Sequence, residues 1–436
     1  MKIRPRQERI GIVSLGCAKN LVDTEMLMHQ LDQNRFKLIF EPSDIHSIDT
    51  IIINSCGFIL DAKEESVNTI LQFTEARKKG NIRKLIVMGC LSQRYREELR
   101  QAIPEVDAFF GVNELPEIIN HIGGTFHREM FGERRLTTPS HYAYLKIAEG
   151  CDRRCSFCVI PVIRGPHRSR PEEEIIIEAK KLVTKGVKEI ILIAQDTTYY
   201  GLDLYRKRRL PHLVDQLASL PGVEWIRIHY SYPDHFPLHL LDIMQQKNKI
   251  CRYIDMPLQH ISDRILRSMK RGISSDKTRR LIEMIRNKLP DVVIRTTFIV
   301  GYPGETDTEF NELLHFTNET EFERLGAFMY SAEEGTHAFR LGKNVSESLK
   351  KERMEILMQQ QDKISMRLNQ KKIGQVCKAV IDRIEGGYLI ARTEADSPEI
   401  DNEVLIPISS NHPDPGSFCT IKITGTESFD LYARIV

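Results

Sequence analysis

Long apolar runs are missing from this chain of 436 residues. No stretch approaches the roughly 18 consecutive apolar residues that a membrane-spanning helix requires. The opening residues Met1–Arg9 contain no apolar segment like that of an export signal, so we expect a cytoplasmic protein. A net charge is also almost absent, since 62 Lys and Arg stand against 60 Asp and Glu and leave +2. That surplus is too small to indicate that the whole chain binds a nucleic acid.

A disulfide framework is not indicated either, because the nine cysteines are odd in number and cytosolic thiols stay reduced. Cysteines that cluster therefore favour metal binding or redox chemistry. With 41% hydrophobic and 28% charged residues, the composition is that of a globular protein and excludes a disordered or coiled-coil chain. At roughly 100 to 200 residues per domain, the length indicates two to four domains.

The region 1–133 alternates short apolar runs with helix-like stretches. We expect strands at 10–15, 49–53 and 84–88, and helices at 21–31, 62–79 and 93–102. This alternation predicts a parallel α/β sheet domain. Cys17, Cys56 and Cys90 each follow a predicted strand, and the carboxyl ends of parallel strands share one edge of the sheet. We therefore expect three thiols in one crevice.

The region 138–372 alternates again, with strands expected at 143–147, 189–194, 225–229, 253–256, 292–299 and 326–330. Six such units fit a partial (β/α)6 barrel of TIM type, whose working residues should lie at the carboxyl ends of the strands. A helix over 347–372 leads out of it. The region 374–436 has short apolar runs between Gly, Pro, Asp and Asn, which predicts a small antiparallel β-barrel of about five strands.

The strongest local motif is Cys151-Asp-Arg-Arg-Cys155-Ser-Phe-Cys158. Three thiolates at this spacing can hold three corners of a cubane iron-sulfur cluster. A fourth ligand is missing, so one iron could bind a substrate or cofactor, as the open coordination position of the metal does in a hydrolase. Two alternatives stay open, namely a zinc site completed by a histidine and three unrelated buried thiols.

This cysteine motif, with Phe157 before its last member, resembles the signature of radical S-adenosylmethionine (SAM) enzymes. The resemblance implies a partial (β/α)6 barrel and a [4Fe–4S] cluster on Cys151, Cys155 and Cys158. It also implies that SAM binds the open iron and is split to a 5′-deoxyadenosyl radical, with Phe157 near the adenine.

Further motifs resemble the methylthiotransferases within that superfamily. They are Ser14–Glu25, Asn54–Phe58, Met88–Cys90, the run from Cys158 to Pro171, and Ala194–Thr198. The resemblance implies a second, auxiliary [4Fe–4S] cluster held by Cys17, Cys56 and Cys90, and a terminal TRAM domain. All six cysteines would then be catalytic.

Methylthiotransferases modify either transfer RNA or a ribosomal protein. Gly16–Asp23 and Ala395–Asp401 resemble the type that modifies a ribosomal protein. That type implies addition of a methylthio group to the β-carbon of an aspartate in the twelfth small-subunit ribosomal protein. It would use two SAM molecules, two clusters, an electron donor and a sulfur donor, with a substrate that is either free or ribosome-bound.

The terminal region offers a separate electrostatic argument, since 374–436 contains five basic and ten acidic residues. A module that docks RNA should be basic, whereas an acidic one suits a basic ribosomal protein; the acids could instead only solubilise the barrel. A transfer-RNA methylthiotransferase is thus the first alternative. A non-catalytic iron-sulfur electron carrier or RNA-binding protein is the second, but carriers normally have four protein ligands per cluster.

Other candidates lie at predicted strand ends. Gln195 and Asp196 follow the second strand of the central region, and Gly301, Gly304 and Glu305 follow the fifth, so all five are candidate SAM contacts. For Glu305, a helix-start acid is an equal alternative. Arg164, Arg168 and Arg170 either steer a carboxylate substrate or form a solvated loop. Cys251, Cys377 and Cys419 lack companions and are expected to be structural, and Trp225 to pack within a strand.

Overall fold

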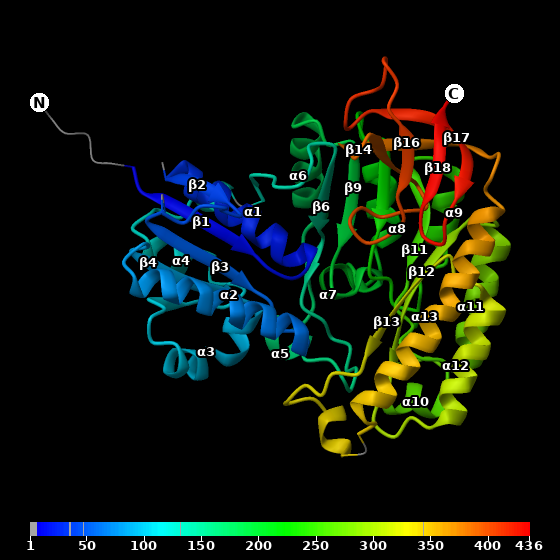
Figure 1. Ribbon diagram of the computed structural model, residues 1–436, viewed down its shortest axis with the longest axis horizontal. Helices are drawn as coiled ribbons and strands as arrows, with labels where there is room; N and C mark the ends of the chain where they lie inside the picture. The colour runs from blue at the N-terminus through cyan, green and yellow to red at the C-terminus, as the bar shows by residue number, and fades with distance from the viewer. Residues whose placement is uncertain (1–6, 35, 47, 131, 343) are drawn as a thin grey trace, which may run out of the picture. The chain divides into compact units, whose positions relative to one another are not determined.

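The computed structural model describes residues 7–34, 36–46, 48–130, 132–342 and 344–436 (Figure 1). Residues 1–6, on which part of the expectation about an export signal rests, lie outside this set. Two compact units are present, one comprising 1–138, 149–153 and 158–167, and the other 139–148, 154–157 and 168–436. Each is described by itself. No helix in the described ranges is long and apolar enough to cross a membrane.

The first unit is built on a five-stranded parallel sheet, as the sequence predicts. Its order is β2 (Lys37–Phe40), β1 (Arg9–Ser14), β3 (Thr50–Ser55), β4 (Lys84–Gly89) and β5 (Ala108–Phe109). The central strand β3 is buried along its whole length because both faces are covered. The edge strands β2 and β5 are short and were not predicted.

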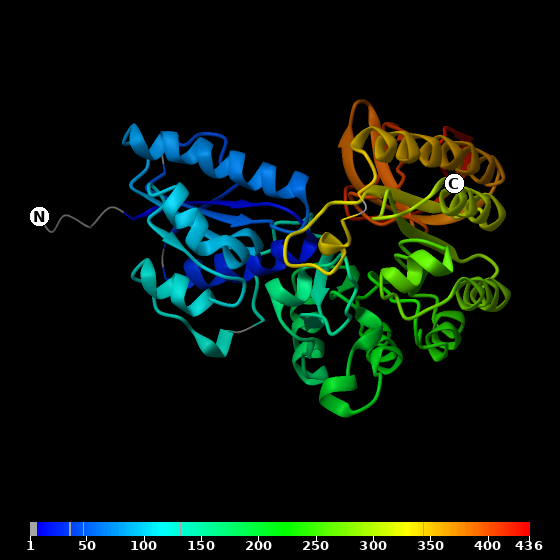
Figure 2. The same ribbon diagram turned by 90° about the horizontal axis from the view of Figure 1, so that it is seen from below.

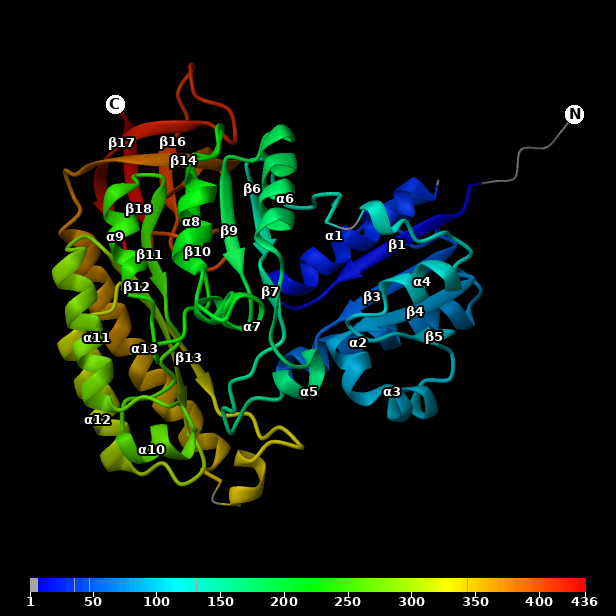
Figure 3. The same ribbon diagram turned by 180° about the vertical axis from the view of Figure 1, so that it is seen from behind.

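Helices cover both faces of this sheet (Figures 1 and 3). On one face, α1 (Ala18–Gln33) and α4 (Leu115–His121) pack through Leu27, Leu31 and Ile118. On the other, α2 (Leu60–Lys78) and α3 (Cys90–Ala102) pack through Ile70 and Leu99. The short α5 (Ile160–Arg164) also belongs to this unit. The arrangement places the carboxyl ends of β1, β3 and β4 along one edge.

The second unit contains a six-stranded parallel sheet, which confirms the predicted partial barrel. Its order is β13 (Arg324–Met329), β12 (Val293–Val300), β11 (Ile250–Asp255), β10 (Trp225–Ile228), β9 (Glu189–Ile193) and β6 (Tyr142–Lys146). Each predicted strand is present within a few residues of its expected bounds.

Helices alternate with these strands and lie outside the curved sheet (Figure 2). They are α6 (Glu172–Thr184), α7 (Leu202–Tyr205), α8 (Leu210–Ala218), α9 (His239–Gln246), α10 (Asp263–Ser268), α11 (Ser275–Lys288) and α12 (Asp307–Thr320). The predicted exit helix is α13 (Glu347–Gln370). The short strands β7 (Ala148–Glu149) and β8 (Arg168–Ser169) flank the cysteine loop in sequence.

The terminal region forms the predicted closed barrel of five strands, in the order β14 (Val376–Glu385), β15 (Tyr388–Thr393), β16 (Val404–Pro407), β18 (Leu431–Ile435) and β17 (Phe418–Thr426). Its interior is apolar, with Ile381, Leu389, Val404 and Ile421 fully buried. The barrel lies beside the amino-terminal ends of the strands of the second unit's sheet (Figures 1 and 3).

Some acidic residues of the terminal barrel form ion pairs or hydrogen bonds where the barrel meets these strand ends. Asp396 pairs with Arg324 at the start of β13, and Asp401 accepts a hydrogen bond of 2.6 Å from the Tyr253 hydroxyl. Asp382 lies between His141 and Arg392, 2.7 Å from each. The side chains of Asp382, Arg392, Asp396 and Asp401 are at most 13% exposed, and without them seven acidic and four basic residues of the barrel remain. The sequence count therefore overstates the surface charge, although its sign is unchanged.

Candidate functional site

The three amino-terminal cysteines follow neighbouring strands and meet at one edge of the first sheet. Cys17 directly precedes α1, Cys56 follows β3, and Cys90 is the first residue of α3 after β4. A Cβ atom placed on Gly16 would lie 2.8 Å from the Cβ of Cys56 and 2.9 Å from its Sγ. Gly16 has φ +90°, so glycine is required here both for backbone conformation and for the close approach of the two loops.

The loops that carry these cysteines are fixed by buried polar side chains. Asn20 Nδ2 donates to the carbonyls of Leu15 (2.9 Å) and Ser55 (3.2 Å), which lie in the segments preceding Cys17 and Cys56. The Ser66 hydroxyl accepts from the Cys56 N–H at 2.9 Å. Sequence reasoning did not single out Asn20 or Ser66 as site residues. Asn20 lies within the motif Gly16–Asp23, but only its contacts reveal that it holds two loops together.

The electrostatic environment differs among the three thiols. Burial raises the pKa of Cys90 to about 12, although Arg164 opposes the shift. Burial also raises the pKa of Cys56. At Cys17, burial would raise the pKa, but Lys19, Arg164 and hydrogen bonds from the backbone of Asn20 and Lys19 together lower it. The two cations and the backbone hydrogen bonds thus favour the thiolate form of Cys17, which is the form that binds metal.

A cubane cluster is the group that this donor set fits. Among the described residues, no three His, Cys, Asp or Glu side chains are arranged to hold a single metal ion. Three soft thiolates at one sheet edge suit iron and sulfur.

The loop of the second cysteine set begins with a glycine that cannot be replaced without strain. Gly150 has φ +75°, and a Cβ there would lie 2.1 Å from the Pro166 carbonyl oxygen. Cys151 N–H donates to the carbonyl of Gly165 at 3.1 Å. Cys151 and Cys158 both belong to the first unit. Val159 and Ile163, which follow Cys158, pack against Cys90 in a small apolar cluster.

Cys155 and Phe157 belong to the second unit. Cys155 Sγ lies 3.8 Å from the Tyr232 hydroxyl and 3.4 Å from Arg271 Nη1. Ser156 lies between Cys155 and Phe157 in the sequence, and its hydroxyl is 2.8 Å from that of Tyr302. Phe157 is half-buried against an apolar cluster that includes Met269 and Tyr330. Its proposed contact with adenine stays a prediction.

Gln195 and Asp196 lie where the sequence predicts, just past the carboxyl end of β9. Asp196 is buried and accepts a hydrogen bond of 2.6 Å from the Thr198 hydroxyl. Thr197 bonds through its N–H to the carbonyl of Tyr230, beyond β10. The turn is therefore held at the strand ends, where a cofactor contact is expected.

The turn Gly301–Glu305 follows β12 and is anchored by its own acid. The carboxylate of Glu305 is fully buried, accepts from the Gly301 N–H at 3.1 Å and pairs with Arg353 at 2.8 Å. A Cβ on Gly301 would lie 2.3 Å from Cγ of Lys350, and Gly304 has φ +79°. These contacts give Glu305 a role in shaping the turn. SAM binding by the three residues stays a prediction.

The three arginines predicted as one basic run have different environments. Arg164 is buried, Arg170 pairs with Glu178 at 2.7 Å, and Arg168 is exposed. They therefore do not form a single charged surface. Trp225 and Cys251 are buried together in one apolar cluster, as expected for structural residues.

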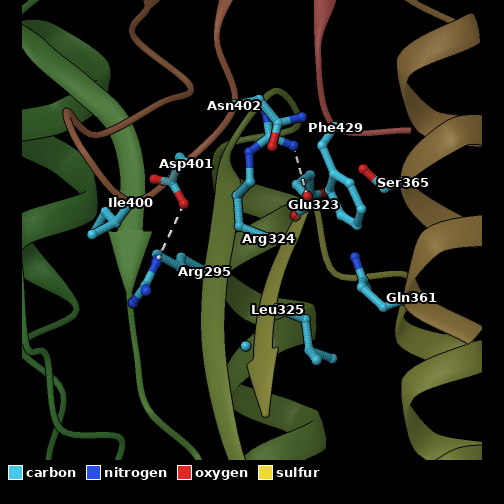
Figure 4. A pocket seen from close by; sticks show the side chains of 11 residues that line it. Arg295, Glu323, Arg324, Leu325, Gln361, Ser365, Ile400, Asp401, Asn402 and Phe429 are labelled. Carbon is cyan, nitrogen blue, oxygen red and sulfur yellow. Dashed lines mark hydrogen bonds and ion pairs between the residues drawn. The ribbon is translucent and has the colours of Figure 1, made fainter. Parts of the chain in front are cut away.

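A cavity of about 150 Å³ lies elsewhere in the second unit, beside the terminal barrel (Figure 4). Arg295 and Arg324 line it from β12 and β13, Gln361 and Ser365 from α13, and Phe429 from the barrel. Because it is at the amino-terminal ends of the strands, it is remote from the edge where Gln195 and Glu305 lie.

Comparisons with known proteins match three parts of the chain to families. Residues 9–111 match uncharacterized protein family UPF0004, residues 145–317 match the radical SAM superfamily, and residues 373–436 match the TRAM domain. A "Ribosomal protein uS12 methylthiotransferase RimO" from Porphyromonas gingivalis is 51% identical over 99% of this chain and 100% of its own length. Another of the same name, from Cytophaga hutchinsonii, is 50% identical over all of both chains.

This chain belongs to the RimO family of radical SAM methylthiotransferases. The solved radical SAM methyltransferase TsrM from Kitasatospora setae, with cobalamin and a [4Fe–4S] cluster bound, shares the fold at a TM-score of 0.55. It is 13% identical, and the match covers 74% of this chain and 75% of that one. The RimO relationship therefore rests on sequence, and the structural likeness supports the fold alone.

Proposed function

We propose that this enzyme attaches a methylthio group to the β-carbon of an aspartate in ribosomal protein uS12. The observation that carries the proposal is the meeting of Cys17, Cys56 and Cys90 at one sheet edge, in a chain that also has the motif Cys151–Cys158. Relatives about 50% identical over nearly the whole chain are named ribosomal protein uS12 methylthiotransferase, which supports the substrate protein and the transferred group.

The two sets of cysteines would have different roles in the reaction. Cys151, Cys155 and Cys158 would hold a radical-generating [4Fe–4S] cluster, and Cys17, Cys56 and Cys90 an auxiliary one, each leaving one iron open. When bound, these clusters with two SAM molecules supply a 5′-deoxyadenosyl radical and a methylated sulfur. The chemistry is needed because an aspartate β-carbon is neither acidic nor nucleophilic enough to react at neutral pH. The proposed contacts for SAM are Phe157, Gln195, Asp196, Gly301, Gly304 and Glu305.

The exposed acids of the terminal barrel support a basic protein substrate. Asp414 and Glu427 are exposed, and the barrel keeps more acidic than basic residues after its buried pairs are set aside. Such a surface would repel RNA and attract a basic protein. The proposal includes an electron donor, a sulfur donor and a cytoplasmic location, where ribosomal proteins are assembled.

Cysteine variants test the division of duties. In anaerobically reconstituted enzyme, Cys155→Ala should abolish 5′-deoxyadenosine formation. Cys56→Ala should spare much of it but eliminate methylthio transfer. Each variant should hold about four irons per chain against about eight in the parent. Cys419→Ala, which alters a cysteine outside both sets, is the matched control. Equal loss of both reactions in the two variants would contradict the assignment.

Mass spectrometry identifies the substrate. After incubation with uS12 and with transfer RNA, a methylthio mass gain on one uS12 aspartate supports the proposal. A gain on transfer RNA alone would replace it by the transfer-RNA function.

Charge reversal tests the docking surface better than deletion of the barrel. Deletion would remove Asp396, the ion-pair partner of Arg324, and would also uncover the strand ends against which the barrel packs. We expect Asp414→Lys/Glu427→Lys to weaken uS12 binding, while Glu98→Lys/Glu283→Lys, an equal charge change on exposed helix residues, should not. Unchanged affinity in the barrel variant would reject the docking surface.

A further inference from the structure

Arg164 is a buried cation whose contacts converge on the amino-terminal cysteine site. Its side chain is 2% exposed. Nη1 lies 3.1 Å from Asp23 Oδ2 and 3.0 Å from both carboxylate oxygens of Glu149. Nη2 donates to Asn20 Oδ1 and to Cys90 Sγ, the latter at 3.5 Å. One guanidinium thus contacts two carboxylates, one amide and one thiol.

The two edges of the guanidinium have separate partners. Asp23 and Glu149 balance its charge from one side, which allows the cation to be buried. On the other side, Nη2 donates to Asn20 and Cys90. Burial would lower the pKa of Arg164, but Asp23, Glu149 and the thiols raise it well above its ordinary value. Arginine does not lose its proton in proteins, so this charge and this donor are permanent.

Asn20 extends the effect of Arg164 to the other two cysteines. Its amide nitrogen donates to the carbonyls of Leu15 and Ser55, and its oxygen accepts from Arg164. The segments before Cys17 and Cys56 are therefore joined through Asn20 to the guanidinium that contacts Cys90. A lysine would supply charge but not the planar fork that reaches both sides at once.

We infer that Arg164 is a positioning residue of the auxiliary cluster, which orients Cys90 and raises the reduction potential of that cluster. The inference rests on the proposed function, because it requires iron and sulfur on Cys17, Cys56 and Cys90. Hydrogen bonds to ligand sulfurs and nearby charge are the means by which proteins set the potentials of such clusters. A fixed cation beside Cys90 stabilises the reduced, more negative state.

The test measures the auxiliary cluster alone, in a chain in which Cys151, Cys155 and Cys158 are replaced by Ala. About four irons per chain are expected there, and an absence of iron would refute the proposed function itself. With iron present, we expect Arg164→Gln to lower the midpoint potential, followed by electron paramagnetic resonance, by about 59 mV or more. That fall is a tenfold shift in a one-electron equilibrium.

Two further variants complete the design. Arg168→Gln removes an exposed arginine from the same segment and should leave the potential unchanged. Arg164→Lys keeps the charge without the fork, and its potential should lie between those of Arg164→Gln and the parent. If Arg164→Gln does not retain iron, the comparison rests on Arg164→Lys. A potential equal to that of the parent in every variant that retains iron would overturn the inference while leaving the proposed function intact.

Discussion

Removing the carboxylate of Asp396 should destabilise the second unit more than any change at an exposed acid of the barrel. Asp396 is fully buried and Arg324 is 5% exposed. Arg324 Nε donates to Asp396 Oδ1 at 3.0 Å, and the Thr393 hydroxyl donates to Oδ2 at 2.9 Å. Asp396→Ala would remove the carboxylate that pairs directly with the buried guanidinium and leave only the more distant charge of Asp401. Loss of such a direct partner costs about 3–5 kcal/mol of unfolding free energy.

The single tryptophan of the chain supplies the assay. Trp225 lies in β10, and its ring is 4.8 Å from that of Phe418 in the barrel strand β17, so its fluorescence reports on this contact. Urea unfolding of the parent and of Asp396→Ala should show the predicted difference. Asp414→Ala is the matched control, because it removes an exposed carboxylate of the same barrel and should change the free energy by no more than about 0.5 kcal/mol.

A loss below about 1 kcal/mol in Asp396→Ala would refute the reasoning, since it is the size expected of an exposed pair. A second variant separates charge from packing. Asp396→Leu/Arg324→Met removes both charges together, and it should recover most of the lost stability because an apolar pair needs no counter-ion.

Three further outcomes are expected. Arg324 keeps the pKa of Asp396 below its ordinary value despite burial. The Asp396 carboxylate therefore contributes its full stabilisation above the unfolded pKa of about 3.9 and loses it on further acidification. In Asp396→Asn, the acid-induced change in Trp225 fluorescence should depend less steeply on pH. Gly150→Ala, strained at φ +75°, should lose about half of the bound iron, and full iron content would contradict the fit of that loop. Asn20→Ala should lose auxiliary iron but still form 5′-deoxyadenosine; undiminished methylthio transfer would be the contrary result.

The parts of the fold that are periodic in sequence were predictable. The apolar runs 51–53 and 190–193 mark buried parallel strands because both faces of such strands are covered. The edge strands β2 and β5 are short and half-exposed, so they carry no such pattern. The placing of Cys17, Cys56 and Cys90 was predictable as well, because a residue that follows a parallel strand has a defined position at the sheet edge.

Long-range polar pairing was not predictable. Arg164 and Glu149 are 15 residues apart, and Asp396 and Arg324 are 72 apart, and no local spacing relates the members of either pair. The sequence marks Arg164 as one of three loop arginines and Asp396 as one of ten barrel acids. Only the fold distinguishes a buried partner from a solvated side chain. For the same reason, the buried ion pair between Glu305 and Arg353 could not be predicted from the sequence.

The buried pairs of the terminal barrel have a consequence for exchanging modules between relatives. Gly374 is a convenient point at which to divide the coding sequence, but several contacts join residues before it to residues after it. Arg324, Tyr253 and His141 all depend on carboxylates encoded after that point. A transplanted barrel would have to bring matching acids at the positions of Asp382, Asp396 and Asp401. The segment that must be exchanged as a whole is thus larger than the β-barrel. It includes the amino-terminal ends of the strands that pair with the barrel carboxylates.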